Sequence, residues 1–254
     1  MNEFTQPPSI PPRQPDPPHH SMQMPRPVNG MFSTFGADFG PMNESPTPSK
    51  VVEALLKHPA RVTHELLKGK RRRTTLVLLL IVAVCMSAYG LLMGFFSGGE
   101  QLWFVPVKVL AGTLLAFLIC LPSLYIFACL SGSDQSFPEV VGLFLQSLAL
   151  GGILLVGFAP VAWIFSQSTG TIGFMGFLHL LFWMVGMYFG LRLLSAAFVF
   201  LHQRPMKVLK LWMVIYVLVV MQMCTALRPL VGEFAGYRLQ GKKFFLAHWA
   251  ESLD

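Results

Sequence analysis

The basic run KGKRRR at residues 68–73 is followed at once by TTLVLLLIVAVCMSAYGLLMGFFS at residues 74–97, a segment without a charged side chain. At about 1.5 Å per residue, a helix of this length reaches roughly 36 Å and crosses a hydrocarbon core of about 30 Å. Each Lys or Arg at the bilayer centre costs about 2.5 kcal/mol or more, so the basic run is retained on the cytoplasmic side. The two stretches together predict an uncleaved membrane anchor that enters from the cytoplasm.

The composition of the 254-residue chain extends this prediction to the whole protein. Hydrophobic residues make up 54% of the chain and charged residues only 12%, whereas an ordinary soluble domain has about 25% charged residues. The sequence therefore predicts an all-α fold, a polytopic bundle of transmembrane helices. The formal net charge of +7 is concentrated ahead of the first span and lacks interleaved aromatic residues, so we expect contact with membrane lipids and no binding of nucleic acid.

Apolar stretches and polar turns divide the rest of the chain into about five spans, which we place at residues 74–97, 103–130, 139–165, 172–201 and 211–227. The alternation of sides brings the basic loop after the fourth span back to the cytoplasm, as the positive-inside rule requires. The residues expected to fix the topology and to meet lipid headgroups are Lys68, Lys70, Arg71, Arg72, Arg73, Arg204, Lys207 and Lys210. The interfacial C-terminal tail, residues 228–254, then lies outside, although its four basic residues oppose this placement.

Residues 1–49 hold twelve of the nineteen prolines and little continuous apolar sequence. Such a segment cannot bury enough apolar surface to offset the entropy of ordering it, so we expect a disordered, proline-rich cytoplasmic tail. The string PPRQPDPP at residues 11–18 fits an aromatic-lined groove in a partner protein, and a flexible tail without a ligand is the alternative.

Residues 50–73 comprise an amphipathic segment and the basic run at residues 68–73. Apolar residues recur at near-helical spacing against charged ones up to Lys68, and Pro59 interrupts the pattern. We expect two short helices in the cytoplasmic interface, or else a helix pair whose apolar stripe binds a partner.

Few polar side chains occur within the predicted spans. Arg192 lies roughly 13 Å from the cytoplasmic end of its span, where it either pairs with Glu139 or snorkels to the headgroups. For His179 we expect a hydrogen-bonded packing role rather than a metal ligand or a proton relay. For Gln146 and Gln222 we expect hydrogen bonds between helices.

Two pairs of glycines have the small-xxx-small spacing that lets helix backbones approach closely: Gly90 with Gly94, and Gly186 with Gly190. We expect them to lie at helix–helix contacts. The spacing alone leaves open whether these contacts form within one chain or between copies in a homo-oligomer.

No catalytic motif occurs in the chain: GxSxG, HExxH, the P-loop and a GxGxxG that follows a strand are all absent. The four cysteines lie in apolar stretches, without a CxxC pair or a His at metal-ligand spacing. We therefore expect no enzyme activity, no metal and no cofactor.

The order of parts resembles the Yip-domain superfamily of five-span integral membrane proteins in the proline-rich tail, the lead-in LLKHPARVTHELLKGK at residues 55–70, the short turns and the glycine-rich centre. More specifically, the chain is similar to a bacterial branch that ends its last span with an LRP-type sequence, here Leu227, Arg228 and Pro229. The resemblance implies a protein of the bacterial inner (plasma) membrane with its N-terminus in the cytoplasm. The tail sequence of the eukaryotic members is absent, so the resemblance does not imply GTPase binding.

These features favour a non-enzymatic membrane scaffold or accessory subunit, which works through helix packing and recruits protein partners of a membrane complex with its tail. The alternative is a subunit of a small-molecule or lipid transporter, whose path would be lined by Pro122, Gly151, Gly152, Pro160 and Arg192. A transporter needs polar side chains, or helices interrupted by glycine, that face the interior of the bundle, whereas a scaffold needs a well-packed core.

Overall fold

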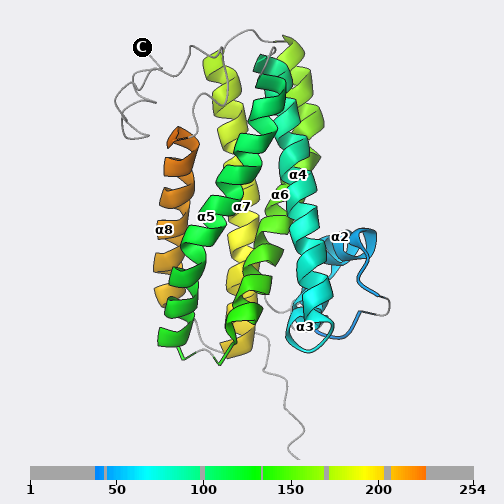
Figure 1. The fold of residues 1–254 in the computed structure, drawn as a ribbon, viewed down its shortest axis with the longest axis vertical. Helices are drawn as coiled ribbons and strands as arrows, with labels where there is room; N and C mark the ends of the chain where they lie inside the picture. The colour runs from blue at the N-terminus through cyan, green and yellow to red at the C-terminus, as the bar shows by residue number, and fades with distance from the viewer. Residues whose placement is uncertain are drawn as a thin grey trace, which may run out of the picture.

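The computed structural model describes residues 38–42, 45–97, 101–132, 134–168, 172–202 and 207–226. These residues contain no strand and form seven helices (Figure 1): α2 Pro48–Lys57, α3 Pro59–Leu67, α4 Arg71–Ser97, α5 Gln101–Leu130, α6 Phe137–Ser168, α7 Ile172–His202 and α8 Lys207–Ala226. Four of them, α4 to α7, are long and apolar enough to cross a membrane. The prediction of an all-α protein with several membrane-spanning helices is therefore confirmed.

The described residues do not show the fifth predicted span. Its counterpart, α8, is apolar over Val208–Met223, a stretch of roughly 24 Å that is shorter than a hydrocarbon core of about 30 Å. The first four predicted spans agree with α4 to α7 within about three residues at each end. The described residues thus show four candidate spans, and the fifth stays a prediction; the predicted C-terminal tail, residues 228–254, lies outside them.

The long helices run in alternating directions, and α6 lies at the centre of the bundle (Figure 1). It packs against both α4 and α7, while α5 packs against α4 and α8 packs against α5. The short helices α2 and α3 lie beside the end of the bundle at which α4 and α6 begin (Figure 1). We call this the basic end, because it carries Lys68, Lys70, Arg71, Arg72 and Arg73.

Close backbone contact between α6 and α7 sets the register of these two helices. A Cβ atom added at Gly190 would lie 2.7 Å from the carbonyl oxygen of Ser147, and one added at Gly186 would lie 3.0 Å from that of Gly151. Each helix thus contributes a small-xxx-small pair. The contact expected at Gly186 and Gly190 lies within one chain.

The first glycine pair lies on α4. A Cβ atom added at Gly90 would lie 2.6 Å from Cα of Pro106, so the backbones of α4 and α5 touch where α5 continues through a proline. Gly94, one turn further along α4, is buried as well. Gly90 therefore lies at a close contact between neighbouring helices.

Aromatic side chains pack α8 against the bundle. The fully buried Trp212 lies edge-on to Phe144 of α6, with ring centroids 5.3 Å apart, and it stacks on Tyr216. Its Nε1 donates a hydrogen bond to Oγ of Ser123 in α5 at 3.0 Å. Because aromatic pairs contribute about 0.5–1.5 kcal/mol each beyond their buried area, this cluster stabilises the docking of α8.

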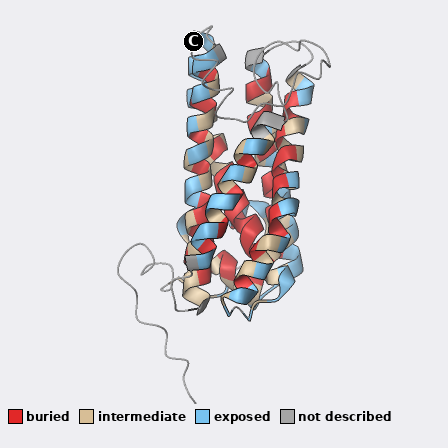
Figure 2. Ribbon diagram, turned by 90° about the vertical axis from the view of Figure 1, so that its left-hand side faces the viewer, coloured by how far each residue is buried: buried red, intermediate tan, exposed pale blue. Residues whose placement is uncertain are grey.

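The outside of the bundle has the character of a lipid-facing surface. Figure 2 shows buried residues turned toward the centre of the bundle and exposed residues along its outside. Exposed aromatic side chains gather at the end opposite the basic end, and we call them the aromatic belt: Phe95, Trp103, Phe104, Trp163, Phe165, Phe174 and Phe177. Aromatic residues concentrate in this way where a membrane protein crosses the level of the lipid headgroups.

We expect Gly190→Ala to lower the stability of the bundle by about 1–3 kcal/mol, because the added methyl group is forced against the backbone of Ser147. Gly157→Ala is the matched control on α6, because a Cβ atom there meets nothing within 4 Å. Alanine also favours the helix over glycine by up to about 1 kcal/mol, so this variant should be no less stable than the wild type. Thermal unfolding in mild detergent measures both, and an unchanged midpoint for Gly190→Ala would contradict the close contact.

Candidate functional site

The helical hairpin α2–α3 has its apolar face against the bundle. Each helix begins with a proline, Pro48 or Pro59, where the missing N–H group is not needed, and His58 joins the two helices. Five apolar side chains of the hairpin are buried against α4, α6 and α7 with exposed fractions of 1% or less: Val51, Leu55, Ala60, Val62 and Leu66. Most of the stripe that was a candidate for partner binding is therefore covered by this chain, although Leu56 of α2 is 53% exposed.

A buried polar contact holds α3 on α6. Gln146, only 1% exposed, donates from Nε2 to the backbone oxygen of Pro59 at 2.9 Å and accepts at Oε1 from the hydroxyl of Thr63 at 3.0 Å. Thr63 is fully buried as well. Because a buried polar group without a partner costs about 1–3 kcal/mol, this contact fixes the position of α3 along α6.

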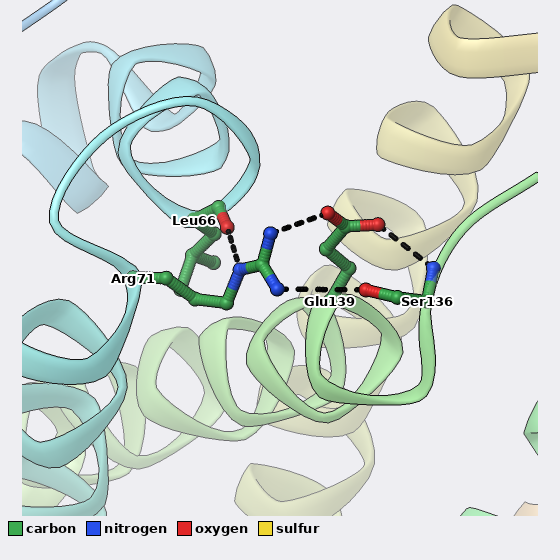
Figure 3. A network of polar contacts seen from close by, with 4 residues as sticks. All are labelled: Leu66, Arg71, Ser136 and Glu139. Atoms are coloured by element: carbon green, nitrogen blue, oxygen red, sulfur yellow. Dashed lines mark hydrogen bonds and ion pairs between the residues drawn. The ribbon is translucent and has the colours of Figure 1, made fainter.

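Arg71, the first residue of α4, joins three parts of the chain at the basic end (Figure 3). Its Nη2 lies 2.6 Å from Oε1 of Glu139 in the first turn of α6, and its Nε donates to the backbone oxygen of Leu66 in α3 at 3.0 Å. The other carboxylate oxygen of Glu139 accepts from the backbone N–H of Ser136 at 2.8 Å. Arg71 thereby ties the end of α3 to the start of α6.

Of the two alternatives for Arg192, the described structure does not show the pairing with Glu139. Because Gly190 lies against Ser147, Arg192 is at the level of about residue 145, which is roughly six residues or 9 Å along α6 from Glu139. The carboxylate is bound by Arg71 instead. In the sequence, Arg71 is one of five similar basic residues, and nothing in the pattern distinguishes it as the one that pairs.

A buried carboxylate connects the hairpin to the chain on both sides of it. Glu65, 8% exposed, accepts hydrogen bonds from the backbone N–H groups of Met42 at 3.1 Å and of Lys70 at 3.3 Å. A buried carboxylate requires such donors, since its charge is otherwise left without solvation. Glu65 therefore fixes both the approach to α2 and the exit from α3.

Residues 38–42 are packed, whereas the sequence predicted a disordered tail up to residue 49. The ring of Phe39 lies 5.0 Å from that of His64, edge-on, and 4.8 Å from that of Phe200 in α7. Asp38 Oδ2 lies 3.1 Å from Nδ1 of His58. A single aromatic residue in a proline-rich stretch has no periodicity, so the sequence did not indicate this anchor. The part of the predicted tail before residue 38 lies outside the described residues.

The other candidate residues lie apart from the hairpin. His179 is buried between α7 and α4, where its Nδ1 lies 2.9 Å from the hydroxyl of Tyr89, and its Nε2 is buried without a hydrogen-bond partner in the described structure. Gln222 is exposed on α8. Of the basic residues expected at the headgroups, Arg204 lies outside the described residues and Lys207 is described only by its backbone; the exposed ones are Lys68, Lys70, Arg72, Arg73 and Lys210.

The hairpin and the exposed basic residues form a polar surface at the basic end. Among the described residues, no group of three or more His, Cys, Asp or Glu side chains could hold a metal ion. The outward face of α2 is polar: Lys57 hydrogen-bonds Glu53 at 3.0 Å, and through this bond and its charge it lowers the pKa of that carboxyl. Such a surface can meet lipid headgroups or a protein partner.

No protein-family model matches the chain, and no curated protein or solved structure is significantly similar to it. The resemblance to the Yip-domain superfamily therefore stays a prediction from the sequence. What the protein does has to follow from the geometry of the hairpin and the bundle.

We expect Arg71→Ala to loosen the hairpin, because it removes the contacts with both Glu139 and the backbone of Leu66. A loss of about 1–2 kcal/mol corresponds to roughly 5- to 30-fold faster exchange of the α3 backbone amides. Arg72→Ala changes an exposed residue next to it and is the matched control, with unchanged exchange. Hydrogen exchange read by mass spectrometry in detergent makes the measurement, and equal protection in the two variants would rule out the tie through Arg71.

Gln146→Leu should lower the stability of the protein by about 1–3 kcal/mol, because the backbone oxygen of Pro59 loses a buried donor. Gln167→Leu, at an exposed position near the other end of α6, is the control and should change little. The double variant Thr63→Val, Gln146→Leu should cost less than the sum of its single changes, because the two side chains bond each other. Denaturant unfolding in detergent micelles measures the wild type, the three single variants and the double variant, and strictly additive costs would argue against the bond.

Proposed function

We propose that this protein is a non-enzymatic integral membrane scaffold or accessory subunit of a membrane complex. The observation that supports the proposal is the fixed attachment of the segment ahead of the first span, which Glu65, Arg71 and Gln146 hold on the bundle. Residues before 38 therefore leave from a defined place at the basic end. A partner that binds the proline-rich sequence at residues 11–18 would be held next to the membrane domain.

We place the basic end in the cytoplasm by the positive-inside rule, with the exposed Lys68, Lys70, Arg72 and Arg73 at the lipid headgroups. With α8 as a fifth span, the C-terminal tail lies on the opposite side of the membrane. The resemblance to the bacterial Yip-type proteins favours the bacterial inner (plasma) membrane as the location.

The alternative, a small-molecule or lipid transporter subunit, is less favoured by the positions of the residues expected to line its path. Gly151 packs against the backbone of α7, and a Cβ atom at Gly152 would lie 3.2 Å from that of Cys85 in α4. Pro122 and Pro160 are exposed on the outside of their helices. These positions support close packing rather than a path through the bundle.

Co-purification in mild detergent tests the scaffold. We expect stoichiometric protein partners with the full chain, and their loss when residues 1–37 are deleted or replaced by a shuffled sequence of the same composition. Arg71→Ala, which loosens the hairpin, should lower the recovery of partners, whereas Arg72→Ala should not. Mass spectrometry of the eluates identifies and counts them.

Two outcomes would oppose the scaffold. The first is a protein that purifies without protein partners whether or not the tail is present, which would make transport in reconstituted vesicles the next measurement. The second is equal recovery of partners when residues 1–37 are attached to an unrelated membrane anchor, because the bundle would then contribute nothing to recruitment.

A further inference from the structure

A groove between α7 and α8 is lined by a cation that has no partner among the described residues. Its volume is about 340 Å³, and it is lined on α7 by Met187, Leu191, Arg192 and Ser195 and on α8 by Met213 and Val217. Arg192 is half-buried, and within the described residues its guanidinium makes no hydrogen bond or ion pair. An arginine in an otherwise apolar part of a membrane protein requires a negative or hydrogen-bonding group to face it.

The described helices supply no counter-ion for this arginine. Within helices α4 to α8 the only acidic residue is Glu139, and its two oxygens bind Arg71 and the backbone N–H of Ser136. Asp134, in the turn before α6, is exposed. Glu139 also lies about 9 Å from Arg192 along the helix axis. The negative group that faces Arg192 therefore comes from outside these helices.

The depth of Arg192 favours the bilayer as the source of this group. Phe177 of the aromatic belt lies about 15 residues, or roughly 23 Å, from Arg192 along α7. Measured from the belt, a hydrocarbon core of about 30 Å ends roughly 7 Å beyond Arg192 toward the basic end. The guanidinium is thus within snorkelling distance of the lipid phosphates in the leaflet at the basic end.

The order of side chains along the groove matches the order of groups in a phospholipid. Ser195, one turn from Arg192 toward the basic end, adds a hydroxyl donor on the same face of α7. Toward the bilayer centre, Met187 and Met184 follow on α7, and Val217 lines the groove on α8. Flexible thioether side chains adapt well to an alkyl chain without a fixed shape.

We propose that this groove binds one anionic phospholipid of the leaflet at the basic end. The phosphate pairs with Arg192 and Ser195, and an acyl chain lies along the methionines between α7 and α8. The site is independent of the proposed scaffold function, because α8 lies on the side of the bundle away from α2 and α3 (Figure 1).

Native mass spectrometry of the full chain tests the site. The protein is reconstituted into phosphatidylcholine nanodiscs with phosphatidylglycerol as the minor lipid and released into mild detergent, and the lipids that it retains are counted. We expect the wild type to retain one phosphatidylglycerol, Arg192→Gln to retain roughly tenfold less, and Arg192→Lys to keep most of the retention. Lys57→Gln removes an exposed charge on the outward face of α2, away from the groove, and is the matched control, with wild-type retention.

Val217→Phe provides a second variant that leaves the charge in place. It fills the apolar part of the groove, so it should displace the acyl chain and lower the retention of phosphatidylglycerol by a similar factor. If Arg192→Gln fails to fold, this variant tests the lipid site by itself. Equal retention of the two lipids by the wild type would overturn the proposal, as would wild-type retention in the variants at both positions. A wild-type protein that retains no lipid, and instead carries a second copy or an acidic partner that Arg192→Gln releases, would also overturn it, because the occupant would then be a protein.

Discussion

The register of α6 against α7 is the constraint on which the placement of the polar residues depends. Backbone contact at two small-residue pairs sets it, because the atoms at Gly190 and Ser147 are too close to admit even a methyl group between them. With this register, Arg192 faces the groove beside α8 and Glu139 remains available to Arg71. Arg71 in turn holds the end of α3. A contact between residues with almost no side chain thus decides which charges meet at the basic end.

In the hairpin, apolar contacts supply stability and polar contacts fix its position on the bundle. The buried apolar side chains of α2 and α3 supply most of the stabilisation, because burial of a large aliphatic side chain contributes about 1.5–3 kcal/mol. Such burial is not directional and would tolerate a shift of the hairpin along the bundle. Gln146 and Glu65 remove this freedom, because each has hydrogen-bond donors or acceptors that only one position satisfies.

The sequence predicts the features that each helix possesses by itself and not those that depend on pairs of helices. The limits of α4 to α7 follow from the length of apolar sequence that a bilayer requires, so they agree closely with the structure. The stripe at residues 50–68 is visible as a pattern, but whether lipid, a partner or the bundle covers it depends on where α6 lies. The pairing of Arg71 with Glu139, 68 residues away, depends on the helical phase of α4 and on the α6–α7 register. Phe39 is an anchor only because His64 and Phe200 are brought beside it.

The hairpin is synthesised well before the helices that receive it. Thr63 and Gln146 are 83 residues apart in the chain, so at about 5–20 residues per second α6 follows α3 by roughly 4–17 s. During this interval α6 and α7 are not yet present to cover the apolar stripe, and an amphipathic segment of this kind binds the membrane surface. The same stripe therefore serves two surfaces in turn, first the bilayer and then the bundle. The stripe can move from the bilayer to the bundle only after α6 and α7 have packed together.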